Sequence, residues 1–231
     1  SSSRLLRFKK YHACIVIMLL LNISSIVHSQ PSEHSDLSLL SPIQKGELLL
    51  SKSLNNEALR LFQSLVDRGK GGGYAFRGVV RAYHGMDKLD DAEVWIENFI
   101  LKNLDSSSAT YSLGYVNYLK KDMKKSEVYF NRALELDGNN TLALNNLGAI
   151  LSHKKLYTSA VEKVREAIRI NPNEPMFFKN LGAIYKKMGS PQLIIADYNL
   201  YLKQGSANLV RGYGMAVGRY LRQTGFRLYD G

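Results

Sequence analysis

A repeat of 34 residues constrains the fold of this chain more than any other feature of its sequence. The dipeptide Leu-Gly recurs at this interval, at Leu113-Gly114, Leu147-Gly148 and Leu181-Gly182. Two other places repeat with the same spacing, one holding Ala58, Ala92, Ser126 and Ala160 and the other Phe62, Ile96, Phe130, Val164 and Tyr198. Fixed self-similarity at this period is typical of a solenoid of stacked helix pairs. The frame predicts five units without insertion or deletion, at 39–72, 73–106, 107–140, 141–174 and 175–208.

The unit 141–174 shows why these places hold these residues. Gly148 on the first helix and Ala160 on the second let the two helices approach closely, and Ala167 lets the next unit pack equally close. Pro172 cannot continue a helix and fixes the end of the second one. Position by position, this unit resembles a tetratricopeptide repeat (TPR). The resemblance implies an all-α, right-handed α-solenoid of five helix–turn–helix repeats, followed by a C-terminal capping helix within 209–231.

Three units depart from this pattern, and the first does so by having Lys45 where leucine is usual. The second has Val80 in the glycine place and Phe99 in the last alanine place, and the fifth has Ile194 and Tyr201 where alanines are expected. Larger side chains at these contacts predict that the helices splay apart locally. Terminal units of solenoids are often atypical because they cap the stack.

Residues 1–29 have the pattern of a secretory signal peptide. A basic start is followed by the apolar run ACIVIMLLL and then by a more polar stretch, and Val27 and Ser29 suit cleavage after Ser29. We therefore expect export to the periplasm or the exterior, with an uncleaved membrane anchor as the alternative. Residues 30–38 are expected to form a flexible linker. The one cysteine, Cys14, lies in the signal segment, so the sequence predicts neither a disulfide nor a cysteine metal site in the repeats.

The expected helix boundaries follow from capping and glycine signals. The first helix should begin near Ser41-Pro42, the second should span 54–67, and the helices of the second unit should span 74–86 and 89–102. The stretch RGKGGG at 68–73 should form a loop and a flexible joint. It lacks the pattern of a phosphate-binding loop. A lone capping helix is expected over 209–222, whereas residues 223–231 have no assignable role.

No pattern in the sequence predicts catalysis or a cofactor. Outside the signal segment the histidines are His34, His84 and His153, and no nucleophile–base or metal-binding motif accompanies them. The acidic cluster Asp87, Asp90, Asp91 and Glu93 could suggest a metal site. Acids at the start of a helix also complement its dipole, and this explanation is sufficient. We therefore expect a protein without enzymatic activity, metal or cofactor.

The resemblance implies that the first helix of each unit lines a concave groove. The candidate partner-binding residues at these places are Arg77, Arg81, Tyr111, Tyr115, Tyr118, Asn145, Asn146, Lys179 and Asn180. Further groove places hold Tyr74, His84, Ser152, His153, Lys186 and Lys187. Asparagine amides can pair with an extended peptide backbone, and arginines and lysines favour an acidic ligand. The sequence therefore predicts a scaffold that binds an extended segment of another protein, as part of a membrane-associated complex or apart from one.

Two alternatives to this interpretation remain open, and two further ones are disfavoured. The tyrosines could stack on sugar rings, which would make the protein a glycan-binding or envelope-assembly subunit of a polysaccharide or surface-structure export system. The groove residues could also be an ordinary solvated face. The carboxylate clamp that some relatives use for chaperone tails is broken, because only Asn146 fits it. The net charge of +11 is compatible with nucleic acid, but a signal peptide would separate the protein from it.

Overall fold

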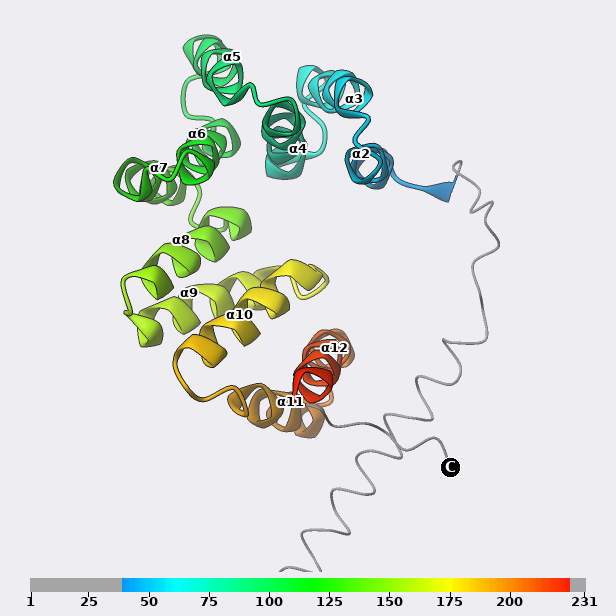
Figure 1. Cartoon of the computed structure of the whole chain (residues 1–231), viewed down its shortest axis with the longest axis vertical. Coiled ribbons are helices and arrows are strands. Elements are labelled where there is room, and N and C mark those ends of the chain that lie inside the picture. Colours follow the sequence, from blue (N-terminus) through cyan, green and yellow to red (C-terminus); the bar gives the residue numbers. More distant parts are fainter. Residues whose placement is uncertain (1–38, 225–231) are drawn as a thin grey trace, which may run out of the picture. The chain divides into compact units, whose positions relative to one another are not determined.

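The computed structural model describes residues 39–224 and is helical throughout this range, apart from short turns (Figure 1). The chain divides into two units, Ser1–Leu40 and Ser41–Gly231, and all eleven described helices lie in the second. The predicted signal peptide, the predicted linker and residues 225–231 lie outside the described range.

Helices follow one another as pairs along Ser41–Gly231. The bounds are α2 Pro42–Ser51, α3 Asn55–Asp67, α4 Gly72–Gly85, α5 Leu89–Lys102, α6 Ser107–Leu119, α7 Met123–Leu136, α8 Thr141–His153, α9 Tyr157–Ile170, α10 Pro175–Lys187, α11 Leu193–Gln204 and α12 Ala207–Gln223. The helices α2, α4, α6, α8 and α10 are the first of each pair, and α12 is the predicted capping helix.

Local capping explains where these helices begin. Ser41 caps α2 through a reciprocal capping box with Gln44, and Pro42 occupies the first helical place, as predicted. The N-cap residues Ser106, Asp122 and Asn140 each accept a hydrogen bond from the backbone N–H three residues further on. The glycine stretch differs from its prediction. Only its first part is a loop, because α4 already begins at Gly72 after a left-handed residue at Gly71.

The turn within each helix pair contains one residue in the left-handed backbone region. These residues are spaced at the period of the repeat: Ser53 with a φ of 58°, Asp87 with 59°, Lys121 with 67°, Lys155 with 62° and Gly189 with 79°. Left-handed backbone costs roughly 1 kcal/mol at residues with a Cβ atom. The first four turns therefore adopt this conformation against the preference of their own residues.

Glycines bring the two helices of the third and fourth pairs together. A Cβ atom built on Gly114 would lie 2.5 Å from Cδ1 of Phe130, and one on Gly148 would lie 2.6 Å from Cγ2 of Val164. Real Cβ atoms do not approach this closely, so these two places need glycine. This confirms the close helix approach predicted from the sequence.

The fifth pair lacks this contact, although it keeps its glycine. A Cβ atom on Gly182 would have no atom within 4 Å. Tyr198, which holds the place of Val164 in the next unit, instead lies 3.4 Å from a Cβ atom built on Gly214 of α12. The buried side chain of Ile194 stands where alanine was expected. The helices α10 and α11 are thus separated at this level, as the larger residues predicted.

The apolar core runs along the helix array as two clusters of buried side chains. One contains Phe62, Val79 and Ile96 between α3 and α6, and the other extends from Tyr111 in α6 to Val217 in α12. Each cluster is built between neighbouring pairs, as expected for a solenoid. The first helices of successive pairs are left on one side, and their exposed residues form the face considered next.

Candidate functional site

The helices α4, α6, α8 and α10 lie on the inner side of the helix array, whereas α3, α5 and α7 lie on its outer side (Figure 1). We call the exposed and half-exposed side chains of these four helices the inner face. All the predicted binding residues belong to these four helices. The structure brings several of them into direct contact and separates others.

A chain of side-chain hydrogen bonds crosses three of the inner helices. Asn180 of α10 donates through Nδ2 to Oδ1 of Asn145 at 2.8 Å, and Asn145 donates to Oδ1 of Asn146 at 3.1 Å. Asn146 then donates to the hydroxyl oxygen of Tyr111 at 3.3 Å. Tyr111 and Asn145 have an exposed fraction of 0%. These two residues can therefore position Asn146 and Asn180, but they cannot themselves touch a ligand in this conformation.

The tyrosines of α6 offer little free ring surface. Tyr115 stacks on Tyr111 with a centroid distance of 6.1 Å, and the Arg77 guanidinium lies 5.6 Å from the centroid of Tyr115. Burial raises the pKa of the Tyr111 hydroxyl well above its usual range. A sugar-stacking surface needs exposed ring faces, so this packing disfavours the glycan alternative. Tyr115 and Tyr118 are half-exposed, and Tyr118 lies at the edge of a pocket.

The two predicted arginines share a carboxylate of their own chain. Arg81 donates to Oε2 of Glu47 in α2, and Nη1 of Arg77 lies 3.9 Å from Oε1 of the same residue. Arg77 also donates to the sulfur of Met176 at 3.4 Å. The Glu174 carboxylate also acts on Arg77, so two carboxylates face the two guanidinium groups at this end of the inner face. Glu47 was not among the predicted residues, although it lies 34 residues before Arg81 and so holds the same place in the preceding repeat, a signal that could have identified it.

The inner face closes on itself near the starts of its helices. Tyr74 accepts a hydrogen bond from Nδ2 of Asn171, which lies 97 residues later, at 3.1 Å. Burial, together with the Glu174 carboxylate, raises the pKa of Tyr74 to about 12. A Cβ atom on Gly73 would lie 3.1 Å from Cδ1 of Leu142. The second repeat, 73–106, therefore contacts the fourth repeat, 141–174, across the inner face. This contact narrows the groove expected from the sequence.

A pocket of about 150 Å³ remains open between α6, α8 and α10. Its lining includes Tyr118, Ser152, His153, Asn180, Ile184 and Lys187. The Ser152 side chain is only 3% exposed, and its Oγ atom has no hydrogen-bond partner among the described residues. A buried polar atom of this kind costs free energy unless something pairs with it. We call this cavity the Ser152 pocket.

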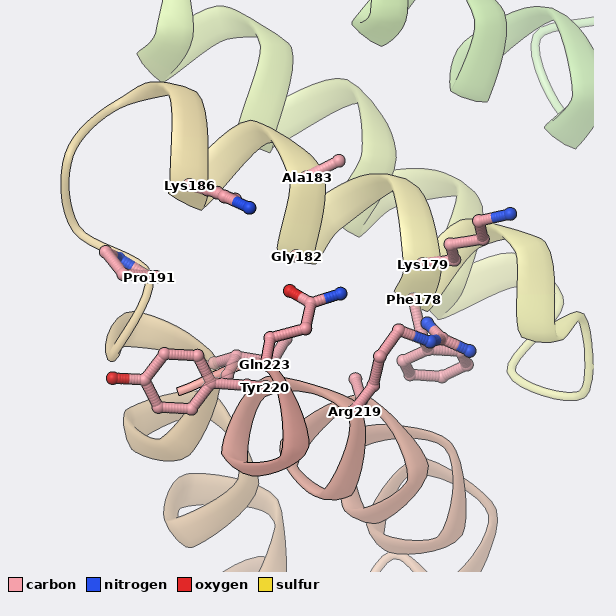
Figure 2. A pocket seen from close by; sticks show the side chains of 11 residues that line it. Phe178, Lys179, Gly182, Ala183, Lys186, Pro191, Arg219, Tyr220 and Gln223 are labelled. Atoms are coloured by element: carbon pink, nitrogen blue, oxygen red, sulfur yellow. The ribbon is translucent and has the colours of Figure 1, made fainter. Parts of the chain in front are cut away.

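Lys179 lies apart from the other predicted residues. It lines a different pocket, between α10 and α12, together with Gly182 and Arg219 (Figure 2). Ala183 lines both cavities, so α10 separates the two. The predicted residues therefore divide into an arginine end, an amide chain leading to the Ser152 pocket, and Lys179, which lies on the side of α10 that faces α12.

The acidic cluster of α5 forms ion pairs. Lys120 contacts Asp90 and Glu93, and Lys125 donates to Glu93 at 2.8 Å. Desolvation opposes ionisation of Glu93, but hydrogen bonds from the two lysines outweigh it and lower its pKa to about 2. Within residues 39–224, no group of histidine, cysteine, aspartate and glutamate side chains is arranged to hold a metal ion. Asp90 and Asp91 also lie in the first turn of α5, as the dipole explanation requires.

Comparison with known proteins identifies the class of repeat. Residues 107–140 match the family model described as "Tetratricopeptide repeat", and they coincide with the third predicted unit. Two curated relatives match part of the chain. "Protein STIP1 homolog" of Dictyostelium discoideum is 25% identical over 115 residues, and "Stress-induced-phosphoprotein 1" of Caenorhabditis elegans is 26% identical over 86. The matches cover 49% and 37% of this chain but only 19% and 27% of those relatives.

One solved structure supports the fold, and a second is similar over a comparable length. The thermophilic TPR protein TTC0263 of Thermus thermophilus superposes with a TM-score of 0.53 at 15% identity, over 76% of this chain and 97% of that one. YrrB, described as a TPR protein with an unusual peptide-binding site, gives a TM-score of 0.43 at 18% identity, over 80% of this chain and 90% of that one. The chain is thus an all-helical stack of TPR-like repeats. One of its repeats, residues 107–140, matches the tetratricopeptide repeat model directly.

Proposed function

We propose that this protein binds an extended segment of a partner protein along its inner face, over the Ser152 pocket. The observation that carries the proposal is the unpartnered Ser152 Oγ atom in a pocket lined from three successive inner helices. The Oγ atom is buried in this conformation, and a change of the Ser152 rotamer would let it pair with the N–H or C=O groups of a peptide backbone. Pre-formed pockets with a few such polar groups fix the orientation of a ligand.

The neighbouring side chains support a peptide in particular. The Nδ2 group of Asn180 is held by Asn145, and this bond turns the side-chain oxygen of Asn180 into a fixed acceptor for a backbone N–H. Lys187 is exposed at the pocket. This cation favours acidic residues in the segment.

Selection from a library of random peptides would test this function. Peptides enriched on the wild-type protein should lose affinity by about tenfold in Lys187→Glu, since one attractive charge becomes repulsive. Ser152→Ala should weaken binding about 3- to 10-fold, the range of one hydrogen bond, without lowering the thermal unfolding midpoint. The matched control is Lys102→Glu on the outer helix α5. Absence of enriched peptides, or equal affinity of all three variants and wild type, would overturn the proposal.

We also propose that the protein is exported, which the composition of residues 1–29 supports. None of the helices within residues 39–224 is long and apolar enough to cross a membrane. The mass of the protein purified from its own cells would test the proposal. A mature chain beginning at Gln30 is expected, and an uncut chain in the soluble cytosolic fraction would contradict it.

A further inference from the structure

The cavity between α10 and α12, which we call the Gly182 pocket, has a volume of about 350 Å³. In Figure 2, Gly182, Ala183 and Lys186 on α10 face Arg219, Tyr220 and Gln223 on α12 across an open space. Phe178 closes one end of this space, and Pro191 lies near the other.

The pocket exists because one repeated contact is missing. In the third and fourth pairs, a side chain of the second helix covers the glycine of the first, as Val164 covers Gly148. In the fifth pair, Tyr198 packs near Gly214 of α12, and Gly182 is left uncovered. Meanwhile Gly212 holds α12 close to α10, because a Cβ atom there would lie 2.2 Å from the Phe178 ring. The fold therefore leaves a side-chain-sized space with fixed walls.

The chemistry of the walls is specific. Phe178, Ile194 and Ala216 are buried and give the pocket an apolar base. The charged residues that line it are all cationic: Lys179, Lys186 and Arg219. Within residues 39–224, none of these three forms an ion pair. An apolar group that carries negative charge on its flanks is complementary to this arrangement.

We propose that the Gly182 pocket takes one large apolar side chain of a partner segment whose neighbouring residues are Asp or Glu. The inference rests on the proposed function, because Ala183 lines both pockets and the same peptide can cross α10 from one to the other. The buried side chain acts as an anchor, and the three cations select the flanking acids. Anchors of this kind carry most of the affinity in protein–peptide recognition.

The peptide library described above also tests this inference. Peptides enriched on wild type should share an aromatic or branched apolar residue flanked by acids. Gly182→Leu fills the pocket from its own wall and should reduce their affinity about tenfold or more, which corresponds to the loss of one buried apolar side chain. The double variant Lys186→Glu/Arg219→Glu should abolish the preference for acids. Lys203→Glu/Arg211→Glu makes the same charge change on α11 and α12 outside the pocket and should bind like wild type.

Unfolding midpoints of all the variants separate binding from folding, and Gly182→Leu should unfold no earlier than wild type, because its site is open and leucine has a higher helix propensity than glycine. Peptides that lose affinity in Lys187→Glu but bind Gly182→Leu normally would overturn this inference and leave the proposed function intact. Binding that appears only after deletion of residues 225–231 would assign the pocket to the chain's own tail instead. Self-association that Gly182→Leu abolishes would assign it to a second copy. Either result would overturn the inference.

Discussion

Gly148 and Gly182 occupy equivalent places in successive repeats, yet they have opposite surroundings. Val164 and the backbone oxygen of Ala160 crowd Gly148, whereas a Cβ atom on Gly182 meets nothing within 4 Å. The sequence pattern alone treats the two as the same residue with the same role. The difference arises from the second helix of the fifth pair, whose Tyr198 packs toward α12.

Substitution by alanine should therefore change stability in opposite directions at the two places. Gly182→Ala should raise the free energy of unfolding by about 0.5–1 kcal/mol, because alanine has the higher helix propensity. Gly148→Ala should lower it by about 1–3 kcal/mol, because the methyl group overpacks a closed contact. Urea denaturation of the two variants and wild type measures both changes. Destabilisation of equal size in both would contradict the open surroundings of Gly182.

Glu93 should make stability depend on pH. Its pKa is lowered from 4.5 to about 2 in the folded protein, so the carboxylate stabilises the fold above pH 4.5 and loses this effect as the pH falls toward 2. The free energy of unfolding of wild type should exceed that of Glu93→Gln by about 1–2 kcal/mol at pH 7, after allowance for the exposed lysine partners. Near pH 2 the two free energies should be almost equal. Urea titrations at both values provide the test, with Glu135→Gln as an exposed control. A pH-independent difference would refute the pairing.

At the scale of elements, a polar contact replaces the missing glycine contact of the fifth pair. Arg165 of α9 donates to Asp197 of α11 at 2.6 Å and to the hydroxyl oxygen of Tyr185 at 2.8 Å, and Tyr185 donates to Asp197 at 2.7 Å. Asp197 is only 5% exposed. The burial of Tyr185 and the Asp197 carboxylate raise the pKa of the tyrosine far above its usual value. These three residues join α11 to the fourth pair.

Removal of this carboxylate should loosen the last two helices. Asp197→Ala leaves Tyr185 without its acceptor, while the half-exposed Arg165 can be hydrated, so we expect a loss of about 1–3 kcal/mol. Amide hydrogen exchange should accelerate in α11 and α12 and stay unchanged in α6. An equal acceleration in α6 would show that the contact stabilises the whole array rather than its end.

The elements themselves were largely predictable from the sequence. The helix predicted for 54–67 is α3, Asn55–Asp67, and the capping helix predicted for 209–222 is α12, Ala207–Gln223. The 34-residue period could reveal these helices because it reflects contacts within each repeat and between adjacent repeats. It could not reveal the Tyr74–Asn171 bond, which joins the second repeat to the fourth and depends on how strongly the array curves. The burial of Tyr111 and Asn145 was missed for the same reason.

Across the whole repeat array, stability should be uneven. In a solenoid each repeat is stabilised by its neighbours, and the end repeats have only one. The third and fourth pairs also have the closed glycine contacts that the fifth lacks. We expect amide protection to be highest in α6 to α9 and lower in α2, α11 and α12, as measured by native-state hydrogen exchange. Uniform protection would indicate that the array unfolds as a single cooperative unit.

The left-handed turns have a consequence for how such a chain can change over time. Serine, aspartate, lysine and glycine all occupy the same turn place with φ between 58° and 79°. The backbone shape there is imposed by the length of the repeat and by the helices on either side, since the residue type varies freely. A duplication or deletion of 34 residues whose end points fall within these turns would therefore restore the turn at the new junction with any of these four residue types.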